Sequence, residues 1–576
     1  MNIVRWLKIY PVFETLAAVG LILVILFRSK PATKTIRKVF FGWFLLVLRR
    51  PWIAFLAIGL LAFTASALLT VFTGIPQPRV HDEFSYLLNA DTFAHGRLTN
   101  PPHPMWKHFE TFHVIQHPTY ASKYPPAQGL ILTVGQVVFG HPIVGVWLSV
   151  ALACSAICWM LAGWCPLHWA WLGGLVAVIR IVFSGPFSPL DLDSFAYWSQ
   201  SYWGGTVATL GGALVFGALP RIMKTKRLRD ALWLALGLAI LANSRPFEGL
   251  VVSIPVVVVL GIWIIKSSCV SWRIRFCRVV LPLVLVLLLT ASWMGFYNFR
   301  VTGDPFRMPY QVCQSTYEIV PVFFGQALKA EPRYNHIILQ NFYRNYICSY
   351  LDYQSFKGWV KKSISKIARF WLFFFGIIFI PPMTFLLTSR QVWRRRNVMF
   401  PLGIVTLMMA SLLTETWFFP HYAAPVACLA FLLMVESLRQ TRRFTWQGKP
   451  VGQHFVRGFL PILLLSAIAS FALVHYQLRP SERWSLDRAH IMRELEEGKG
   501  RHLVIVHYGP NHLAHNEWVY NRANIDGAKV VWAREMDPQS EKELLDYFKG
   551  RRVWLLQADQ LPRLLTPYPG ARLTGE

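Results

Sequence analysis

The sequence is short of charge, and of acidic charge above all. Only 15% of its 576 residues are charged, whereas soluble domains carry about 25%. The chain has 29 Asp and Glu against 58 Lys and Arg, and 54% of it is hydrophobic, with 24 Trp and a mean hydropathy of +0.38. This composition excludes an ordinary soluble domain and predicts a polytopic membrane protein.

Features typical of other classes are also missing. The chain has no internal repeat and no low-complexity segment. Its first apolar run, 9–27, lacks the small-residue cleavage site of a signal peptide, so we expect a retained helix. Most of the eight cysteines lie in or beside apolar runs, where Cys behaves as a small hydrophobe. Cys313 and Cys348 lie instead in a long polar segment, where an oxidising compartment would allow a disulfide.

Apolar runs of about 17 to 25 residues are long enough to cross the hydrocarbon core of a membrane. About twelve such runs are present, each expected to form a helix: 9–27, 51–74, 142–164, 167–184, 203–220, 231–246, 249–266, 279–297, 368–388, 398–414, 417–438 and 456–475. Residues 39–48 are expected to form an interfacial helix or to extend a neighbouring one. The run 129–139 is too short to span and predicts a helix at the interface.

Basic residues cluster in alternate short connections between these runs. Short cytoplasmic connections are enriched in Lys and Arg, so the clusters predict which side of the membrane is cytoplasmic. The clusters lie at 28–50, 221–229, 273–278, 390–396 and 439–449. We therefore interpret the net charge of +29 as a mark of topology and of contact with anionic lipids, not of nucleic-acid binding.

The opposite, outer side receives the longer polar segments, and charged residues become frequent near the C-terminus. There, 503–507, 529–533 and 552–557 predict short strands, and 541–548 predicts a helix. We expect an integral multi-pass membrane protein, located in the bacterial inner membrane with its C-terminal domain in the periplasm. The expected divisions are an extra N-terminal helix with a basic cytoplasmic linker (1–50), a transmembrane domain (51–475) with outer loops 75–141 and 298–367, and an outer-face α/β domain (476–576).

Two adjacent carboxylates, Asp82 and Glu83, open the first outer loop. Ionisable groups at the mouth of a membrane helix are costly unless they face water, a partner or a substrate. The pair is therefore either a hydrated loop start or a functional site. Further along the loop, Lys123 precedes Pro125 and Pro126, which stiffen the backbone. Its ammonium either binds an anionic headgroup or snorkels from a helix start.

Histidines also gather in this loop. His103, His108 and His113 follow one another at intervals of five residues, with carboxylates nearby. Such side chains ligate zinc in many proteins, although no tight ligand motif is present here. Histidine is also common at wet, aromatic-rich interfaces. A divalent metal held by these residues is therefore a secondary hypothesis.

Together, these motifs resemble those of a known family. The segment 81–86 (HDEFSY), just after an early membrane helix, is followed by 123–129 (KYPPAQG). This order is similar to the first outer loop of the polytopic GT-C glycosyltransferases, which include protein O-mannosyltransferases and lipid A aminoarabinose transferases. Later motifs agree: 243–249 (NSRPFEG), 298–305 (NFRVTGDP) and 420–425 (PHYAAP). The resemblance covers about residues 50 to 440, and the order of these short motifs carries more weight than any one of them.

The resemblance implies an enzyme, a hexosyl or pentosyl transferase with a GT-C-like helical fold. Its donor would be a sugar linked to polyprenyl phosphate, and its acceptor a protein, lipid or glycan bound at the outer membrane face. Asp82 would be the general base that deprotonates the acceptor, and Glu83 would orient the acceptor or share that role. We expect inversion at the anomeric carbon and no required cofactor.

A departing phosphate needs cationic partners. Lys123, Arg245 and Arg300 are the candidates. Arg245 alternatively pairs with Glu248, and Arg300 alternatively belongs to a solvated turn. Candidate substrate-binding residues are Tyr86, Asp191, Asp193, His421 and Tyr422. The aromatic members of that set also fit anchoring at a membrane interface.

Two other functions compete with this one. A transporter or flippase for a lipid-linked or anionic substrate would carry polar residues along mid-membrane helix faces. Here the polar residues gather in the outer loops instead. A non-catalytic assembly protein, whose tail recruits partners, would leave Asp82 replaceable.

Overall fold

The computed structural model describes residues 50–183, 196–267, 270–477 and 484–569. The expected helices at 9–27 and 39–48, and the candidate site residues Asp191 and Asp193, lie outside these residues. The chain divides into two compact units, each made of three segments. We call Met1–Ile75, Val146–Ala291 and Lys357–Arg479 the helical unit, and Pro76–Gly145, Ser292–Phe356 and Pro480–Glu576 the mixed unit.

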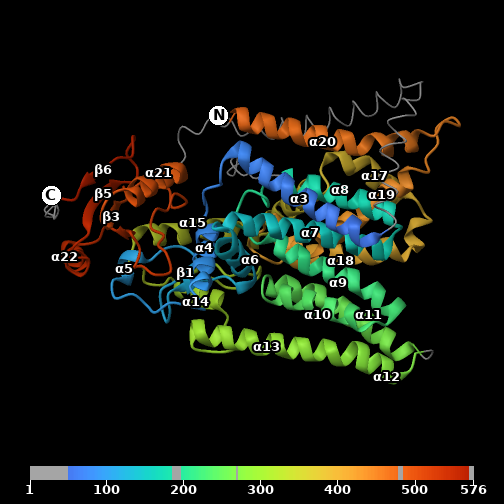
Figure 1. Ribbon diagram of the computed structural model, residues 1–576, viewed down its shortest axis with the longest axis horizontal. Coiled ribbons are helices and arrows are strands. Elements are labelled where there is room, and N and C mark those ends of the chain that lie inside the picture. Colours follow the sequence, from blue (N-terminus) through green and yellow to red (C-terminus); the bar gives the residue numbers. More distant parts are fainter. Residues whose placement is uncertain (1–49, 184–195, 268–269, 478–483, 570–576) are drawn as a thin grey trace. The chain divides into compact units, whose positions relative to one another are not determined.

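Long apolar helices make up the helical unit (Figure 1). Seven in the described ranges are long and apolar enough to cross a membrane: α3 (Pro51–Thr73), α7 (Pro142–Trp164), α9 (Gly205–Thr225), α11 (Pro246–Lys266), α12 with α13 (Trp272–Thr302), η4 with α19 (Pro420–Thr441) and α20 (Val451–Gln477). Shorter helices accompany them: α8 (Leu167–Phe183), α10 (Leu228–Ala242), α16 (Phe356–Phe374), α17 (Ile380–Thr388) and α18 (Arg396–Leu412).

The expected number of about twelve spans is therefore too high for the part of the chain that is described, which has seven or, with one bent pair, eight. The helices occur where apolar runs predicted them, but α8 and α18 have 17 residues and α10 only 15. The expected span 368–388 is broken. Its two halves, α16 and α17, meet at 88° across a break that contains Gly376 at φ 69°.

Helices of this unit approach one another closely where glycines face a neighbour. A Cβ atom at Gly212 of α9 would lie 1.9 Å from the carbonyl oxygen of Pro425, and one at Gly237 of α10 would lie 2.7 Å from that of Gly211. Small residues allow such contacts between membrane helices, where van der Waals packing and not apolar burial drives association.

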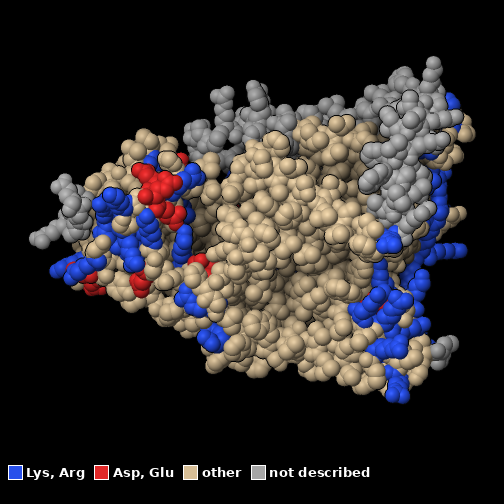
Figure 2. Space-filling model, viewed as in Figure 1, with Lys and Arg blue, Asp and Glu red and all other residues tan. Residues whose placement is uncertain are grey.

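The basic clusters of the described chain lie together at one end of the helical unit. The Arg396 guanidinium is 3.9 Å from the sulfur of Met223, and Gln440 donates a hydrogen bond to the Ser389 hydroxyl. These contacts join the end of α9 to the start of α18, and the end of α17 to the end of α19. Figure 2 shows Lys and Arg gathered at this end and almost none along the sides of the helices. Within this unit, the basic connections between helices lie on one side, as predicted.

The mixed unit contains a four-stranded sheet in the order β4-β3-β5-β6. Strand β3 (His502–His507) runs parallel to β4 (Val530–Arg534) and β5 (Arg552–Gln557), while β6 (Leu565–Pro567) is antiparallel to β5. Strands β3, β4 and β5 lie where sequence patterns predicted them. Helices α21 (Trp484–Glu497) and α22 (Pro538–Tyr547) accompany the sheet. The near-continuous burial of β3 is typical of a central parallel strand.

The outer loops supply the rest of this unit. Their elements are α4 (His81–Ala94), α5 (Trp106–Phe109), β1 (Val114–Ile115), β2 (Ala121–Ser122), α6 (Pro126–Phe139), α14 (Pro309–Tyr317) and α15 (Ile337–Gln354). Phe84, Leu88 and Phe109 of the first loop share one hydrophobic core with Trp518 and Trp532 of the C-terminal segment. The mixed unit is thus assembled from segments far apart in the sequence.

The disulfide that the sequence allows between Cys313 and Cys348 is not present in the structure. Both thiols are free in the structure. Cys313 is buried on the inner face of α14, among Phe112, Tyr317 and Tyr343, whereas Cys348 lies on the exposed face of α15. The helical phase of the two elements therefore turns the thiols to different environments, which spacing in the sequence does not reveal.

Candidate functional site

The acidic pair lies in the first turn of α4, and its two carboxylates have different roles. The Glu83 side chain is buried and turns back, where Oε2 accepts the backbone N–H groups of Arg79 (2.8 Å) and Val80 (3.4 Å). Such a bond satisfies backbone donors ahead of a helix start. The Asp82 side chain is 33% exposed and so remains accessible. It lies at the helix N-terminus, the end at which the backbone dipole is positive.

Asp82 contacts the second motif of the first loop. The Tyr124 hydroxyl donates a hydrogen bond to Asp82 Oδ1, and His113 Nε2 lies 3.9 Å from Oδ2. The Tyr124 ring stacks on Tyr86, with centroids 4.4 Å apart. The structure thus brings together residues of the 81–86 and 123–129 motifs, which lie far apart along the chain.

His113 is held in an unusual backbone conformation beside Asp82. Its φ is 62°, and its carbonyl accepts hydrogen bonds from the Ser85 hydroxyl (2.6 Å) and the Lys123 backbone N–H (3.2 Å). Burial, helped by the charge of Lys123, lowers the pKa of His113 well below its usual value. The imidazole is therefore neutral at pH 7, and the Asp82 carboxylate is not neutralised by it.

Lys123 places a positive charge in the same cluster. Its ammonium is 5.3 Å from the centroid of the Tyr124 ring and 4.0 Å from Glu318 Oε1. Both side chains of the Lys123–Glu318 pair are largely buried, at 14% and 12% exposure. Burial raises the pKa of Glu318 despite the attraction of Lys123. The pair places one cation and one carboxyl group beside Tyr124.

Sequence reasoning missed several members of this cluster. Tyr124 follows Lys123 within the segment 123–129, so its place in that motif could have marked it as a candidate site residue. Burial and, second to it, the charge of Asp82 raise the pKa of Tyr346 to about 12. Neither Tyr346 nor Glu318 carries a local pattern that would have marked it.

Three other candidates lie together in the helical unit. The Arg245 guanidinium is 3.3 Å from Glu248 Oε1 and 4.4 Å from the centroid of the Tyr422 ring. Tyr422 contacts His421, whose Nδ1 is hydrogen-bonded to the Tyr197 hydroxyl. The structural pairing of Arg245 with Glu248, weighed as an alternative, is present.

Arg300, His103 and His108 do not join these clusters in the described chain. Arg300 is exposed in the last turn of α13. His103 Nε2 bonds Asp526 (3.0 Å), whereas the two nitrogens of His108 bond backbone carbonyls of Arg534 and Ser540. Among the described residues, no three His, Cys, Asp or Glu side chains are placed to hold a metal ion. The three histidines therefore do not converge on one ligand set.

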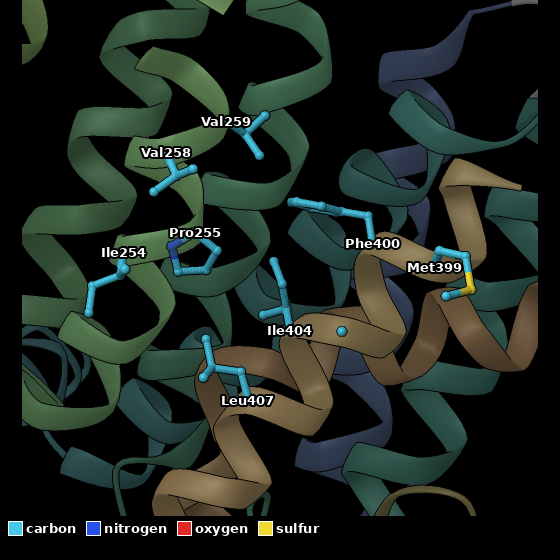
Figure 3. Close-up of a pocket in the computed structure, with 9 residues that line it drawn as sticks. Ile254, Pro255, Val258, Val259, Met399, Phe400, Ile404 and Leu407 are labelled. Atoms are coloured by element: carbon cyan, nitrogen blue, oxygen red, sulfur yellow. The ribbon is translucent and has the colours of Figure 1, made fainter. Parts of the chain in front are cut away.

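An apolar groove opens between α11 and α18 of the helical unit (Figure 3). Its volume is about 430 Å³. Only hydrocarbon, aromatic and thioether side chains line it, together with one glycine: Ile254, Pro255, Val258, Val259, Met399, Phe400, Gly403, Ile404 and Leu407. A hydrocarbon chain is favoured to bind in such a groove, because binding removes its apolar surface from water.

The buried histidines predict that the protein loses stability in mild acid. Burial is the main cause of a lowered pKa at His81, His113 and His336, and it brings that of His336 to about 3. Once unfolded, each binds a proton near pH 6.5. Stability is therefore complete above pH 6.5 and falls below it, by roughly 1 kcal/mol per histidine at pH 5.5.

The measurement is the thermal unfolding midpoint in detergent at pH 7.5, 6.5 and 5.5. We expect His336→Gln to reduce the pH dependence and a matched change at the exposed His95 to leave it intact. A midpoint that does not fall between pH 7.5 and 5.5 would contradict the neutral state of these imidazoles.

Comparison with known proteins finds relatives at the level of structure. No protein-family model and no curated protein sequence matches the chain. ArnT from Cupriavidus metallidurans bound to undecaprenyl phosphate is similar with a TM-score of 0.47 and 14% identity, over 90% of this chain and 93% of that chain. The apo oligosaccharyltransferase of Archaeoglobus fulgidus is similar with a TM-score of 0.45 and 11% identity, over 87% and 69%. These are GT-C glycosyltransferases.

At these identities and TM-scores the likeness fixes no residue-by-residue correspondence. The function of this chain has to be inferred from its own side chains.

Proposed function

We propose that the protein is a glycosyltransferase that moves a sugar from a polyprenyl-phosphate carrier to an acceptor, with Asp82 as the general base. One observation carries the proposal. Asp82 is a partly exposed carboxylate at a helix N-terminus, fixed by the Tyr124 hydroxyl, and its neighbourhood contains the largely buried ammonium of Lys123. A base and a cation in one cluster are what displacement of a phosphate by a hydroxyl or amine requires.

The reaction proposed is a single displacement. The acceptor oxygen or nitrogen attacks the anomeric carbon while its proton moves to Asp82. The bond between that carbon and the phosphate oxygen breaks, and its electron pair leaves with the phosphate. Attack from the face opposite the leaving group inverts the anomeric configuration. Cationic side chains balance the charge on the phosphate, so we propose that no metal cofactor is needed.

Lys123, Arg245 and Arg300 are proposed to serve the donor phosphate. Arg245 caps the start of α11, and the apolar groove begins at Ile254 on the same helix, about 13 Å further along its axis. A donor with its phosphate at Arg245 and its isoprenoid tail in the groove would thus lie along α11. We propose that Tyr86, His421, Tyr422, Asp191 and Asp193 contact the sugar or acceptor, and that Glu83 acts through the fold of α4.

The proposed setting is the inner membrane of a bacterium, with 476–576 as a periplasmic domain and transfer at the outer face. The acceptor is a protein, lipid or glycan, and the sugar a hexose or pentose. The basic end of the helical unit supports the cytoplasmic orientation of that end. The gathering of the candidate base and cation in an outer loop favours an enzyme over a flippase, whose sites lie near the bilayer midplane.

The test is transfer of a radiolabelled sugar from polyprenyl phosphate by the purified full-length protein, with a membrane extract as the source of acceptors. We expect label to move to an extract component at a rate that EDTA leaves unchanged. Absence of both transfer and donor binding, across hexose and pentose donors, would overturn the proposal.

Lys123→Met is predicted to lower kcat/KM for the donor. A hydrogen bond to a charged group contributes about 1.5–3 kcal/mol, so the expected loss is roughly 10- to 100-fold. Lys123→Arg should retain part of the activity, and Lys542→Met, at an exposed position, should retain all of it. Lys123→Met/Glu318→Gln removes both members of the pair. If this double variant regained full activity, the lysine would serve only to neutralise Glu318.

A further inference from the structure

Helix α16 (Phe356–Phe374) has three distinct faces. One is buried against the helical unit and includes Lys366, Phe370 and Phe373. A second is apolar yet exposed, with Ile364 at 63% and Ile367 at 48% exposure. The third is basic: Lys357 and Lys361 are exposed, and Arg369 is half-buried. A helix with an unburied apolar stripe beside a basic stripe is typical of the membrane–water boundary.

The buried face of α16 crosses the ends of two membrane helices. The Lys366 ammonium donates hydrogen bonds to the carbonyls of Leu412 (3.0 Å) and Glu415, at the end of α18. Arg180, in the last turn of α8, donates to the carbonyls of Leu372 (2.8 Å) and Phe373 (2.7 Å). These contacts bind carbonyls at or just beyond the ends of α18 and α16, where intrahelical partners run out. They fix α16 across the ends of α8 and α18.

This end of the unit is the one opposite the basic connections. Helix α18 starts at Arg396, in the basic end, and finishes at Leu412, beneath α16. Helix α17 packs along α19, and the axis of α16 is bent by 88° from that of α17. Helix α16 therefore lies close to the plane of the membrane, at its second surface.

We propose that α16 is an interfacial helix whose basic face, Lys357, Lys361 and Arg369, binds the headgroups of anionic phospholipids on the outer leaflet. Its apolar face, with Ile364 and Ile367, would lie in the acyl chains beneath those headgroups. The two faces together fit a lipid, because a soluble anion would leave the apolar stripe in water. The proposal concerns the anchoring of the helical unit and does not depend on the transfer reaction.

The depth of the helix is tested by spin labels on the full-length protein in vesicles of phosphatidylethanolamine and phosphatidylglycerol. Labels are placed singly at 361, 364, 367 and 369, in a background with Cys269, Cys277 and Cys348 replaced by serine. We expect oxygen to relax the labels at 364 and 367, and an aqueous nickel complex to relax those at 361 and 369. Equal access of the nickel complex to all four would place the helix in water and overturn the proposal.

The lipid is tested by thermal unfolding of the detergent-solubilised protein titrated with phosphatidylglycerol, phosphatidylcholine or inorganic phosphate. Each basic residue near an anionic surface strengthens binding to it, so K357Q/K361Q/R369Q should need at least tenfold more phosphatidylglycerol for half-maximal stabilisation. R493Q/K499Q/K542Q removes as many exposed charges from the mixed unit and should behave as wild type. An unchanged response of the α16 variant, or equal stabilisation by inorganic phosphate, would overturn the proposal.

Discussion

Asp82→Asn is expected to reduce sugar transfer by about 100- to 10,000-fold, the range that a positioned general base contributes. Asparagine keeps the shape of the side chain and still accepts the hydrogen bond of the Tyr124 hydroxyl. The asparagine side chain cannot, however, take up the proton from the hydroxyl or amine of the acceptor. The loss should therefore appear in kcat, with donor binding retained and the thermal midpoint unchanged. Single-turnover transfer of a radiolabelled donor sugar measures it.

Two further variants sharpen this experiment. Asp352→Asn removes an exposed carboxylate from α15 of the same unit and should transfer as wild type. Tyr124→Phe leaves the carboxylate but removes its hydrogen bond, so we expect a smaller loss than for Asp82→Asn. Equal rates for wild type and Asp82→Asn would exclude Asp82 as the base, whatever the protein transfers.

Glu517→Gln is expected to destabilise the mixed unit by about 3–5 kcal/mol, because removing one member of a buried pair leaves an uncompensated charge. The Arg534 guanidinium donates to Glu517 Oε2, and the two side chains are 1% and 0% exposed. Glu517 also accepts the Val519 backbone N–H (2.8 Å) and the Tyr508 hydroxyl. Urea unfolding, followed by tryptophan fluorescence, measures the loss.

The matched double variant separates charge from packing. Glu517→Gln/Arg534→Met removes both charges and should recover part of the stability lost in Glu517→Gln. Glu331→Gln, at the exposed ion pair with Arg344, should leave the midpoint unchanged. If the double variant is less stable than Glu517→Gln, the destabilisation comes from lost contacts and not from a buried charge.

Local patterns predicted the elements of the fold, and longer-range effects decided their arrangement. Apolar runs marked α3, α7 and α11, and alternating or continuous apolar residues marked β3 and β5. The described chain has fewer spans than expected because α8, α10 and α18 have 17 residues or fewer and the run 368–388 turns at Gly376, where φ is 69°. The shared core of Phe84 with Trp518 has no local signal, because each residue is simply apolar in its own segment.

For the candidate site, the positions of the motifs in the sequence were informative, but the directions of their side chains could not be read from it. Asp82 and Lys123 were singled out, and the structure places them in one cluster with Tyr124. Glu83, one residue away from Asp82, turns to the backbone of Arg79 because successive helical residues point about 100° apart. Contacts made by Glu318 and Tyr346 depend on tertiary folding, which no single segment encodes.

The core that joins Phe84 to Trp518 also imposes an order on biogenesis. The loop that carries Asp82 leaves the ribosome early, while Trp484–Glu497 and strands β3 to β5 are made last. At about 5–20 residues per second, the early loop waits on the order of tens of seconds for its packing partners. Until then its apolar side chains are exposed to chaperones and proteases. A chain that stops before Trp484 would insert its membrane helices and still lack a folded Asp82 pocket.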